Sequence, residues 1–132
     1  MRFVDNQRWE TTMSNAEIFV DFMEAFSSGN IDAALDMITD DFSFSGPILQ
    51  AEGKDAFFEG AQMAAAIVKG FTMHRQVEHG DEVVSMYDFE VGAPAIPGKV
   101  SMTEWNTIRD GKLASSRLFF DTAAFNALMP QE

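Results

Sequence analysis

The chain has 132 residues, a normal length for one domain, and 46% of them are hydrophobic, so it can bury a sizeable core. Its net charge of −12 argues against nucleic acid and anionic membrane surfaces as partners, because contacts to phosphate need a basic face. The chain contains no cysteine and only two histidines, which excludes disulfides and leaves a zinc site with too few of its usual ligands. We therefore expect no metal site, and nothing in the sequence calls for an organic cofactor.

The sequence pattern indicates neither a membrane-spanning helix nor a signal peptide. No apolar run approaches the roughly 20 residues that a membrane-spanning helix needs. The N-terminal residues are polar and lack the apolar centre of a signal peptide, so the cytoplasm is the expected compartment. They also lack hydrophobic periodicity. We therefore interpret residues 1–13 as a loose N-terminal arm and residues 14–132 as a single domain.

Helix signals open the periodic part of the chain. Ser14 and Glu17 have the spacing of a capping box, and the apolar residues behind them recur at helical spacing. Gly29 can end this helix in the left-handed conformation. Asn30 then caps a short second helix, whose buried face is expected to extend to Ile38.

The rest of the chain changes from helical to strand periodicity. Residues 42–45 alternate as a short strand does, and a third helix is expected over about 54–69, ended by Gly70. After it, the hydrophobic period is two, and the Gly-Asp pair at 80–81 and the Asp-Gly pair at 110–111 are typical of hairpins. These signals predict an antiparallel meander and a closing helix, over residues 71–79, 82–92, 99–109, 112–121 and 123–128.

Five segments together resemble the NTF2-like superfamily, and within it the SnoaL-like branch. They correspond to the family's first helix and turn, its first strand, the start of its third helix and its final hairpin, and they lie at 22–32, 40–47, 52–57, 105–113 and 117–121. The resemblance implies an α+β cone in which three N-terminal helices pack on a curved antiparallel sheet. It also implies a pocket inside the cone and a homodimer formed through the sheet. It does not fix an activity, because one fold hosts many chemistries.

The family's known chemistries can be compared with this sequence position by position. Ketosteroid isomerase-like members use a carboxylate base that aligns with Gly46, a tyrosine that aligns near Phe22 and a protonated acid that aligns near Glu104. Only the last of these groups is retained. The acid of SnoaL-type polyketide cyclases aligns with Leu118, and the Arg-x-Asp motif of limonene-type epoxide hydrolases aligns with Met102-Thr103-Glu104. We therefore reject the ketosteroid isomerase mechanism as the leading interpretation and retain Glu104 as the recurrent candidate.

Glu104 is the candidate acid–base group of the cone. A carboxyl group in an apolar cavity has a raised pKa and suits a general acid or hydrogen-bond donor near neutral pH. The alternative is a solvent-facing glutamate, or one paired with Arg109 or Arg75. Tyr87 and Asp88 lie on the preceding strand, so either could be the cross-strand neighbour of Glu104. Two close carboxyl groups would push one pKa upward, whereas an Asp88 that faces water would not.

His74 is the candidate base by residue type, since its free pKa is near neutrality. The alternative is a histidine on the sheet face or at a dimer interface. Trp105 follows Glu104 and points to the other strand face, so an inward Glu104 puts Trp105 and Phe119 on an outer face that suits a dimer interface. The candidate ligand-binding wall, which could equally be plain core, consists of Phe22, Phe26, Phe44, Met63, Met102 and Leu118.

Two functional hypotheses of different classes follow. The first is a SnoaL-like protein that binds a small apolar or aromatic molecule in its cone, with acid–base catalysis of isomerase, cyclase or hydrolase type by Glu104, aided by Tyr87, Asp88 or His74. The second is a non-catalytic ligand-binding or dimerisation module. The missing acids at Gly46 and Leu118 motivate the second hypothesis, and whether the chain is an enzyme stays open at this point.

Overall fold

The computed structural model describes residues 14–129, so the predicted arm of residues 1–13 lies outside the described residues. Helix α1 begins as expected: the Ser14 hydroxyl accepts from the backbone N–H of Glu17, whose carboxylate accepts from the Ser14 backbone N–H in return. Gly29 has a φ of 87°, and Asn30 caps the next helix. The helices are α1 (Asn15–Ser27), α2 (Ile31–Asp36), α3 (Lys54–Gly60), α4 (Gln62–Ile67) and α5 (Thr122–Leu128).

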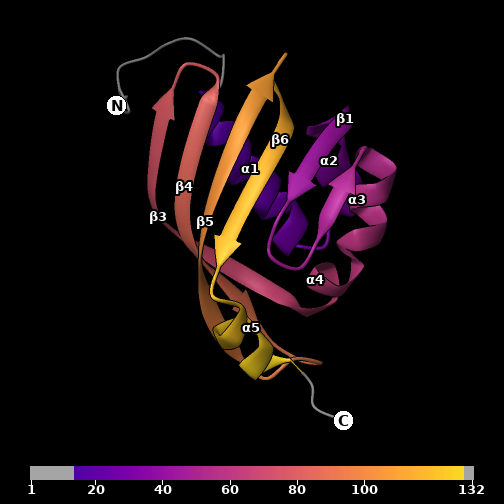
Figure 1. Ribbon diagram of the computed structural model, residues 1–132, viewed down its shortest axis with the longest axis vertical. Coiled ribbons are helices and arrows are strands. Elements are labelled where there is room, and N and C mark those ends of the chain that lie inside the picture. The colour runs from indigo at the N-terminus through magenta and orange to yellow at the C-terminus, as the bar shows by residue number, and fades with distance from the viewer. Residues whose placement is uncertain (1–13, 130–132) are drawn as a thin grey trace.

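One curved sheet of six strands forms the body of the domain, in the order β2-β1-β6-β5-β4-β3 (Figure 1). Its strands are β1 (Ile38–Ser45), β2 (Gln50–Glu52), β3 (Val68–His79), β4 (Glu82–Val91), β5 (Gly98–Arg109) and β6 (Lys112–Phe120). Every neighbouring pair is antiparallel except β1 and β6, which run parallel. The predicted α+β class, curved sheet and meander are confirmed, and Asp110 and Gly111 both adopt the positive φ of a tight hairpin turn.

The predicted third helix is wrong in its extent. Helix α3 ends at Gly60, α4 ends at Ile67, and the chain is already extended at Val68. A methyl group at position 60 would lie 2.4 Å from the side chain of Leu49, so glycine allows the 46–49 loop to rest on the helix at the break. Gly70 does not end a helix, because it pairs with Glu90 inside the sheet.

The first strand is longer than its alternating segment predicts. Ile38 belongs to β1 and is fully buried there, whereas the sequence placed it on the second helix. The short strand β2, which the sequence did not predict, pairs with the end of β1. The parallel pairing of β1 with β6 was not anticipated either, and it brings segments about 70 residues apart side by side.

Helix α1 covers the concave face of the sheet, and α3 lies beside β1 and β2, with α4 next to α3 (Figure 1). The apolar stripe of α1 meets the inward side chains of the strands, and the rings of Phe19 and Tyr87 pack in a tilted arrangement with centroids 5.9 Å apart. The stripe does not fill the cone: a space between the helices and the sheet remains and extends to the 46–49 loop. This space is the site described next.

Candidate functional site

A cavity of about 140 Å³ lies inside the cone. The six side chains that the sequence analysis predicted for a ligand-binding wall all line it: Phe22, Phe26, Phe44, Met63, Met102 and Leu118. The wall is more aromatic than that prediction, since it also includes Phe42, Phe57, Tyr87, Phe89, Phe120 and Phe125. An apolar cavity of roughly 150 Å³ accommodates benzene, so the space here has the scale of one ring.

The mouth of the cavity is at the loop that follows β1. Ile48 and Met63 line the cavity and are nevertheless about half exposed, at 50% and 49%. They therefore mark where the wall meets solvent. Leu49, on the same loop, closes against Gly60 of α3. A molecule entering the cone would pass these apolar side chains first.

Glu104 lies in the wall and is only 5% exposed. The Tyr87 hydroxyl donates to its Oε1 at 2.7 Å, across the antiparallel pairing of β4 with β5. The expectation that Glu104 faces the cone is therefore met. Ser85 is its direct partner in the sheet register, and Tyr87 reaches it diagonally from the same strand. The alternative of a Glu104–Arg109 ion pair is wrong, because Arg109 pairs with Asp41.

Two further donors hold the other carboxylate oxygen. The hydroxyl of Ser116 and the side-chain amide of Asn106, at 3.4 Å, both donate to Oε2 of Glu104. Sequence reasoning missed both residues. Their spacing offered a signal, because Asn106 is two residues from Glu104 and Ser116 two from Leu118, and even offsets share a strand face.

Burial dominates the proton affinity of this group. It raises the pKa of the Glu104 carboxyl, and the hydrogen bonds from Ser116, Tyr87 and Asn106 oppose that rise without cancelling it. Burial and the neighbouring Glu104 also raise the pKa of the Tyr87 hydroxyl well above 10.0. The pair can therefore share, accept or release one proton inside an apolar space.

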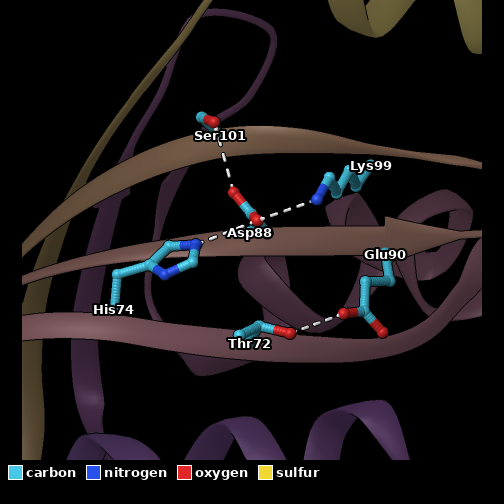
Figure 2. Close-up of polar contacts among 6 residues, drawn as sticks. All are labelled: Thr72, His74, Asp88, Glu90, Lys99 and Ser101. Atoms are coloured by element: carbon cyan, nitrogen blue, oxygen red, sulfur yellow. Dashed lines mark hydrogen bonds and ion pairs between the residues drawn. The ribbon is translucent and has the colours of Figure 1, made fainter.

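Asp88 and His74 do not join this site. They lie on the opposite, outer face of the sheet, where His74 Nε2 is 2.9 Å from Asp88 Oδ2 (Figure 2). Lys99 Nζ is 3.6 Å from the same oxygen, and the Ser101 hydroxyl donates to Oδ1 at 3.2 Å. The hypotheses of paired Asp88 and Glu104 carboxyl groups, and of His74 as a base in the cone, are therefore wrong. Adjacent strand residues point to opposite faces, so Asp88 cannot follow Tyr87 inward.

The outer face also carries exposed aromatic side chains, as the sequence predicted. Trp105 is 37% exposed and Phe119 is 49% exposed, and the Arg117 guanidinium lies 5.2 Å and 5.8 Å from their ring centroids. Met86, on β4, adds a further exposed apolar side chain to this face.

The model of one protein family, described as the SnoaL-like domain, matches residues 19–116. The chain belongs to the SnoaL-like domain family. The match runs from within α1 to within β6, so it includes α2 to α4, β1 to β5 and Glu104, whereas the end of β6 and α5 lie beyond it. Among proteins with curated descriptions, none matches the sequence of this SnoaL-like domain.

Solved structures support the same fold. An NTF2-like protein of unknown function from Burkholderia pseudomallei K96243 superposes with a TM-score of 0.78 at 16% identity, covering 90% of this chain and 100% of the other. TerC co-crystallised with polyporic acid superposes with a TM-score of 0.75 at 22% identity, covering 86% of this chain and 96% of the other. A hypothetical protein with a ketosteroid isomerase-like fold from Catenulispora acidiphila DSM 44928, in complex with trimethylamine, superposes with a TM-score of 0.75 at 17% identity, covering 88% of this chain and 94% of the other. At these identities the likeness establishes the fold alone.

Three further findings concern the acids of the cavity, metal binding and membrane spans in this SnoaL-like domain. Gly46 and Leu118, where the sequence analysis placed the acids of better-known members, both line the cavity without an ionisable group. Within residues 14–129, no three His, Asp or Glu side chains are grouped to hold a metal ion. No helix in that range is long and apolar enough to cross a membrane.

Proposed function

We propose that this SnoaL-like domain binds a small apolar or aromatic molecule in its cone and exchanges a proton with it through Glu104 and Tyr87. The observation that carries the proposal is the Tyr87–Glu104 hydrogen bond in an otherwise apolar wall. A buried acid with a perturbed pKa in a cavity is typical of acid–base sites. The chemistry would be of isomerase, cyclase or hydrolase type.

The polar group of the ligand would meet the only ionisable groups of the described wall. Glu104, with its raised pKa, would act as general acid or hydrogen-bond donor while it is protonated and would accept a proton or hydrogen bond while it is ionised, and the Tyr87 hydroxyl would hold its Oε1 in place. The apolar remainder of the wall would exclude water from that exchange. Relatives of this fold have been crystallised with small molecules, polyporic acid in one case and trimethylamine in another, which supports a cavity of this kind as a binding site.

A second candidate function is ligand binding without turnover. The glycine at position 46 and the leucine at position 118 favour it, since the cavity offers no second carboxyl group to work with Glu104. The two candidates differ in one measurement. With a substrate in hand, Glu104→Gln should abolish a turnover that the unaltered protein shows if the domain is an enzyme, whereas a binding module shows no turnover in either protein.

Binding itself can be tested with methionine methyl groups as probes. Met23, Met63 and Met102 line the cavity, whereas Met86 lies on the outer face. In a protein labelled with 13C at its methionine methyls, titration with ethylbenzene should shift the first three NMR signals and leave that of Met86 unchanged. Equal shifts at all four would contradict binding in the cone.

A pair of variants on α4 sharpens this test. Ala64 lines the cavity and Ala66 is exposed. Ala64→Leu should weaken ethylbenzene binding about tenfold or more, because the larger side chain would occupy part of the cavity that the ligand needs. Ala66→Leu adds the same side chain to solvent and should leave the affinity unchanged. Equal affinity in both variants would place the ligand elsewhere.

We also propose that the domain forms a homodimer through the outer face of its sheet. Met86, Trp105 and Phe119 make this face unusually apolar for a surface, and Arg117 between the rings suits an interface. Light scattering at micromolar concentration should give a dimer. Phe119→Lys should yield monomers, whereas Ile48→Lys, which changes an equally exposed side chain at the cavity mouth, should not. The cytoplasmic location predicted from the sequence stays a prediction.

A further inference from the structure

The cavity wall is asymmetric in charge. Its ionisable groups are Glu104 and Tyr87, and no Lys, Arg or His among residues 14–129 lines it. Glu104 is held by three neutral donors: the Tyr87 hydroxyl, the Ser116 hydroxyl and the Asn106 amide. A buried carboxylate usually has a cation beside it, because removing its charge from water is otherwise costly. The described wall supplies donors for the ionised form of Glu104 but no positive charge.

The hydrogen bonds leave one acceptor position of the carboxylate open. An ionised carboxylate has about four lone-pair positions, two on each oxygen. Ser116 and Asn106 use those of Oε2, and Tyr87 uses one of Oε1. The remaining position is therefore on Oε1, the oxygen that accepts the hydrogen bond of the Tyr87 hydroxyl. A ligand that donates a hydrogen bond can complete this arrangement.

The aromatic rings of the wall favour a cation over a neutral donor. Nine aromatic side chains line the cavity: Phe22, Phe26, Phe42, Phe44, Phe57, Tyr87, Phe89, Phe120 and Phe125. Aromatic rings attract cations, most strongly where water is excluded, and together with a carboxylate they form the surroundings that ammonium groups prefer. An anionic ligand would instead face Glu104 with no compensating charge in the described wall.

We propose that the ligand of this cavity is a small organic ammonium ion, about one ring in size, whose N–H donates to Oε1 of Glu104. This inference rests on the proposed binding function and specifies its ligand class. The ammonium ion would supply the missing counter-charge, so its binding would keep Glu104 ionised. An unbound cone holds the same carboxyl group in apolar surroundings, where the neutral form is favoured.

Four one-ring probes separate charge from shape: benzylammonium, the neutral ethylbenzene and benzyl alcohol of equal heavy-atom number, and the anion benzoate. Calorimetric titration at pH 8 should give benzylammonium the highest affinity of the four and benzoate an affinity at least about tenfold lower. Benzyl alcohol controls for a donor without charge. Any of the other three probes binding as tightly as benzylammonium would overturn the ammonium proposal while leaving the binding function in place. No binding by any of the four would contradict both proposals.

Two variants and a pH series complete the test. Glu104→Gln keeps the side-chain shape and should weaken benzylammonium at least about tenfold, but ethylbenzene less than about threefold. Asp88→Asn removes a carboxylate from the outer face and should change neither affinity. If Glu104→Gln leaves benzylammonium binding unchanged, the proposal is wrong.

In the unaltered protein, benzylammonium affinity should rise with pH as Glu104 ionises. The groups that contact Glu104 are Tyr87 on β4, Asn106 on β5 and Ser116 on β6, and helices α1, α3 and α4 contribute only apolar side chains to the wall. Tyr87 is the only other titratable group there, and it stays protonated in this range. An affinity that falls with rising pH below 8 would overturn the proposal independently of any variant.

Discussion

Two carboxyl groups on adjacent strands of this sheet have almost equal exposed fractions and opposite proton affinities. Glu104 is 5% exposed and its pKa is raised, whereas Asp88 is 7% exposed and its pKa is lowered. Asp88 is covered by His74 and Lys99, whose side chains are themselves 55% and 70% exposed. Glu104 instead faces an apolar cavity and accepts hydrogen bonds from neutral donors only. The exposed fraction of a carboxyl group therefore does not predict its pKa, which depends on the groups that cover it.

The largest expected contrast comes from adding a second carboxyl group on each face. Leu118→Asp puts one directly across from Glu104, and Ser101→Asp puts one directly across from Asp88. Leu118→Asp should lower the free energy of unfolding by about 2–4 kcal/mol at pH 7, because two carboxyl groups would share an apolar space. Ser101→Asp should have a much smaller effect, since His74, Lys99 and solvent are nearby. Urea unfolding of both variants measures this, and equal losses would remove the contrast.

The two faces should also give stability opposite slopes with pH. The folded-state pKa of Glu104 is raised, so its contribution is present below its ordinary pKa of 4.5 and is lost as pH rises through the folded value. Glu104→Gln should therefore gain stability relative to the unaltered protein between pH 5 and pH 8, by about 1.4 kcal/mol for each unit that the pKa is raised.

Asp88 should behave in the reverse sense. Its folded-state pKa is lowered, by His74 above all, so its contribution is present above 3.8 and is lost as pH falls through the folded value. Asp88→Asn should be less stable than the unaltered protein at neutral pH and should approach it in acid. Unfolding measurements from pH 2 to pH 8 cover both variants. Slopes of the same sign for Glu104→Gln and Asp88→Asn would show that the faces do not differ as described.

Removal of a single donor should have a more modest effect. Tyr87→Phe leaves the ring in contact with Phe19 and deletes only the hydroxyl that donates to Glu104. We expect a loss of about 1–2 kcal/mol at pH 7 and a further rise in the pKa of Glu104. Carboxyl 13C NMR of Glu104 measures the pKa directly. An unchanged or lowered pKa would mean that this hydrogen bond does not stabilise the ionised form.

Ionic strength should give the smallest difference between the two faces in its effect on stability. Raising ionic strength from about 0.05 M to 0.5 M shortens the screening length well below 10 Å, which weakens interactions between exposed charges and affects buried ones little. The stability difference between the unaltered protein and Asp88→Asn should therefore shrink with salt. The difference for Glu104→Gln should stay constant, and a shift of equal size in both would contradict the assignment of faces.

The sequence predicted the parts of this fold that depend on local chemistry. The Ser14–Glu17 capping box, the left-handed Gly29 and the tight turn at Asp110-Gly111 each follow from a few neighbouring residues, and each is present. The sequence failed where distant segments decide the outcome. Ile38 joins β1 because β6 lies beside it, and the third helix breaks where the 46–49 loop packs on Gly60.

The candidate site divides in the same way. Strand alternation was sufficient to put Glu104 and Trp105 on opposite faces, and strand and helical periodicity together indicated the six wall residues. The same alternation separates Asp88 from Tyr87, so the pattern itself did not support a pairing of Asp88 with Glu104 inside the cone. The position of His74 could not have been obtained in this way, because the pairing of β3 with β4 shifts register between Met73 and Arg75. A bulge reverses which residues face inward, and its place depends on the partner strand.

The parallel pairing of β1 with β6 has a consequence for how the chain folds during synthesis. The backbone N–H of Leu113 donates to the carbonyl of Met37 at 2.9 Å, so the cone cannot close until the last long strand exists. At about 5–20 residues per second, the aromatic stripe of α1 emerges from the ribosome seconds before the strands that cover it. Contacts so distant along the chain also slow folding. A nascent chain of this protein therefore exposes the phenylalanine side chains of α1 until synthesis has passed β6.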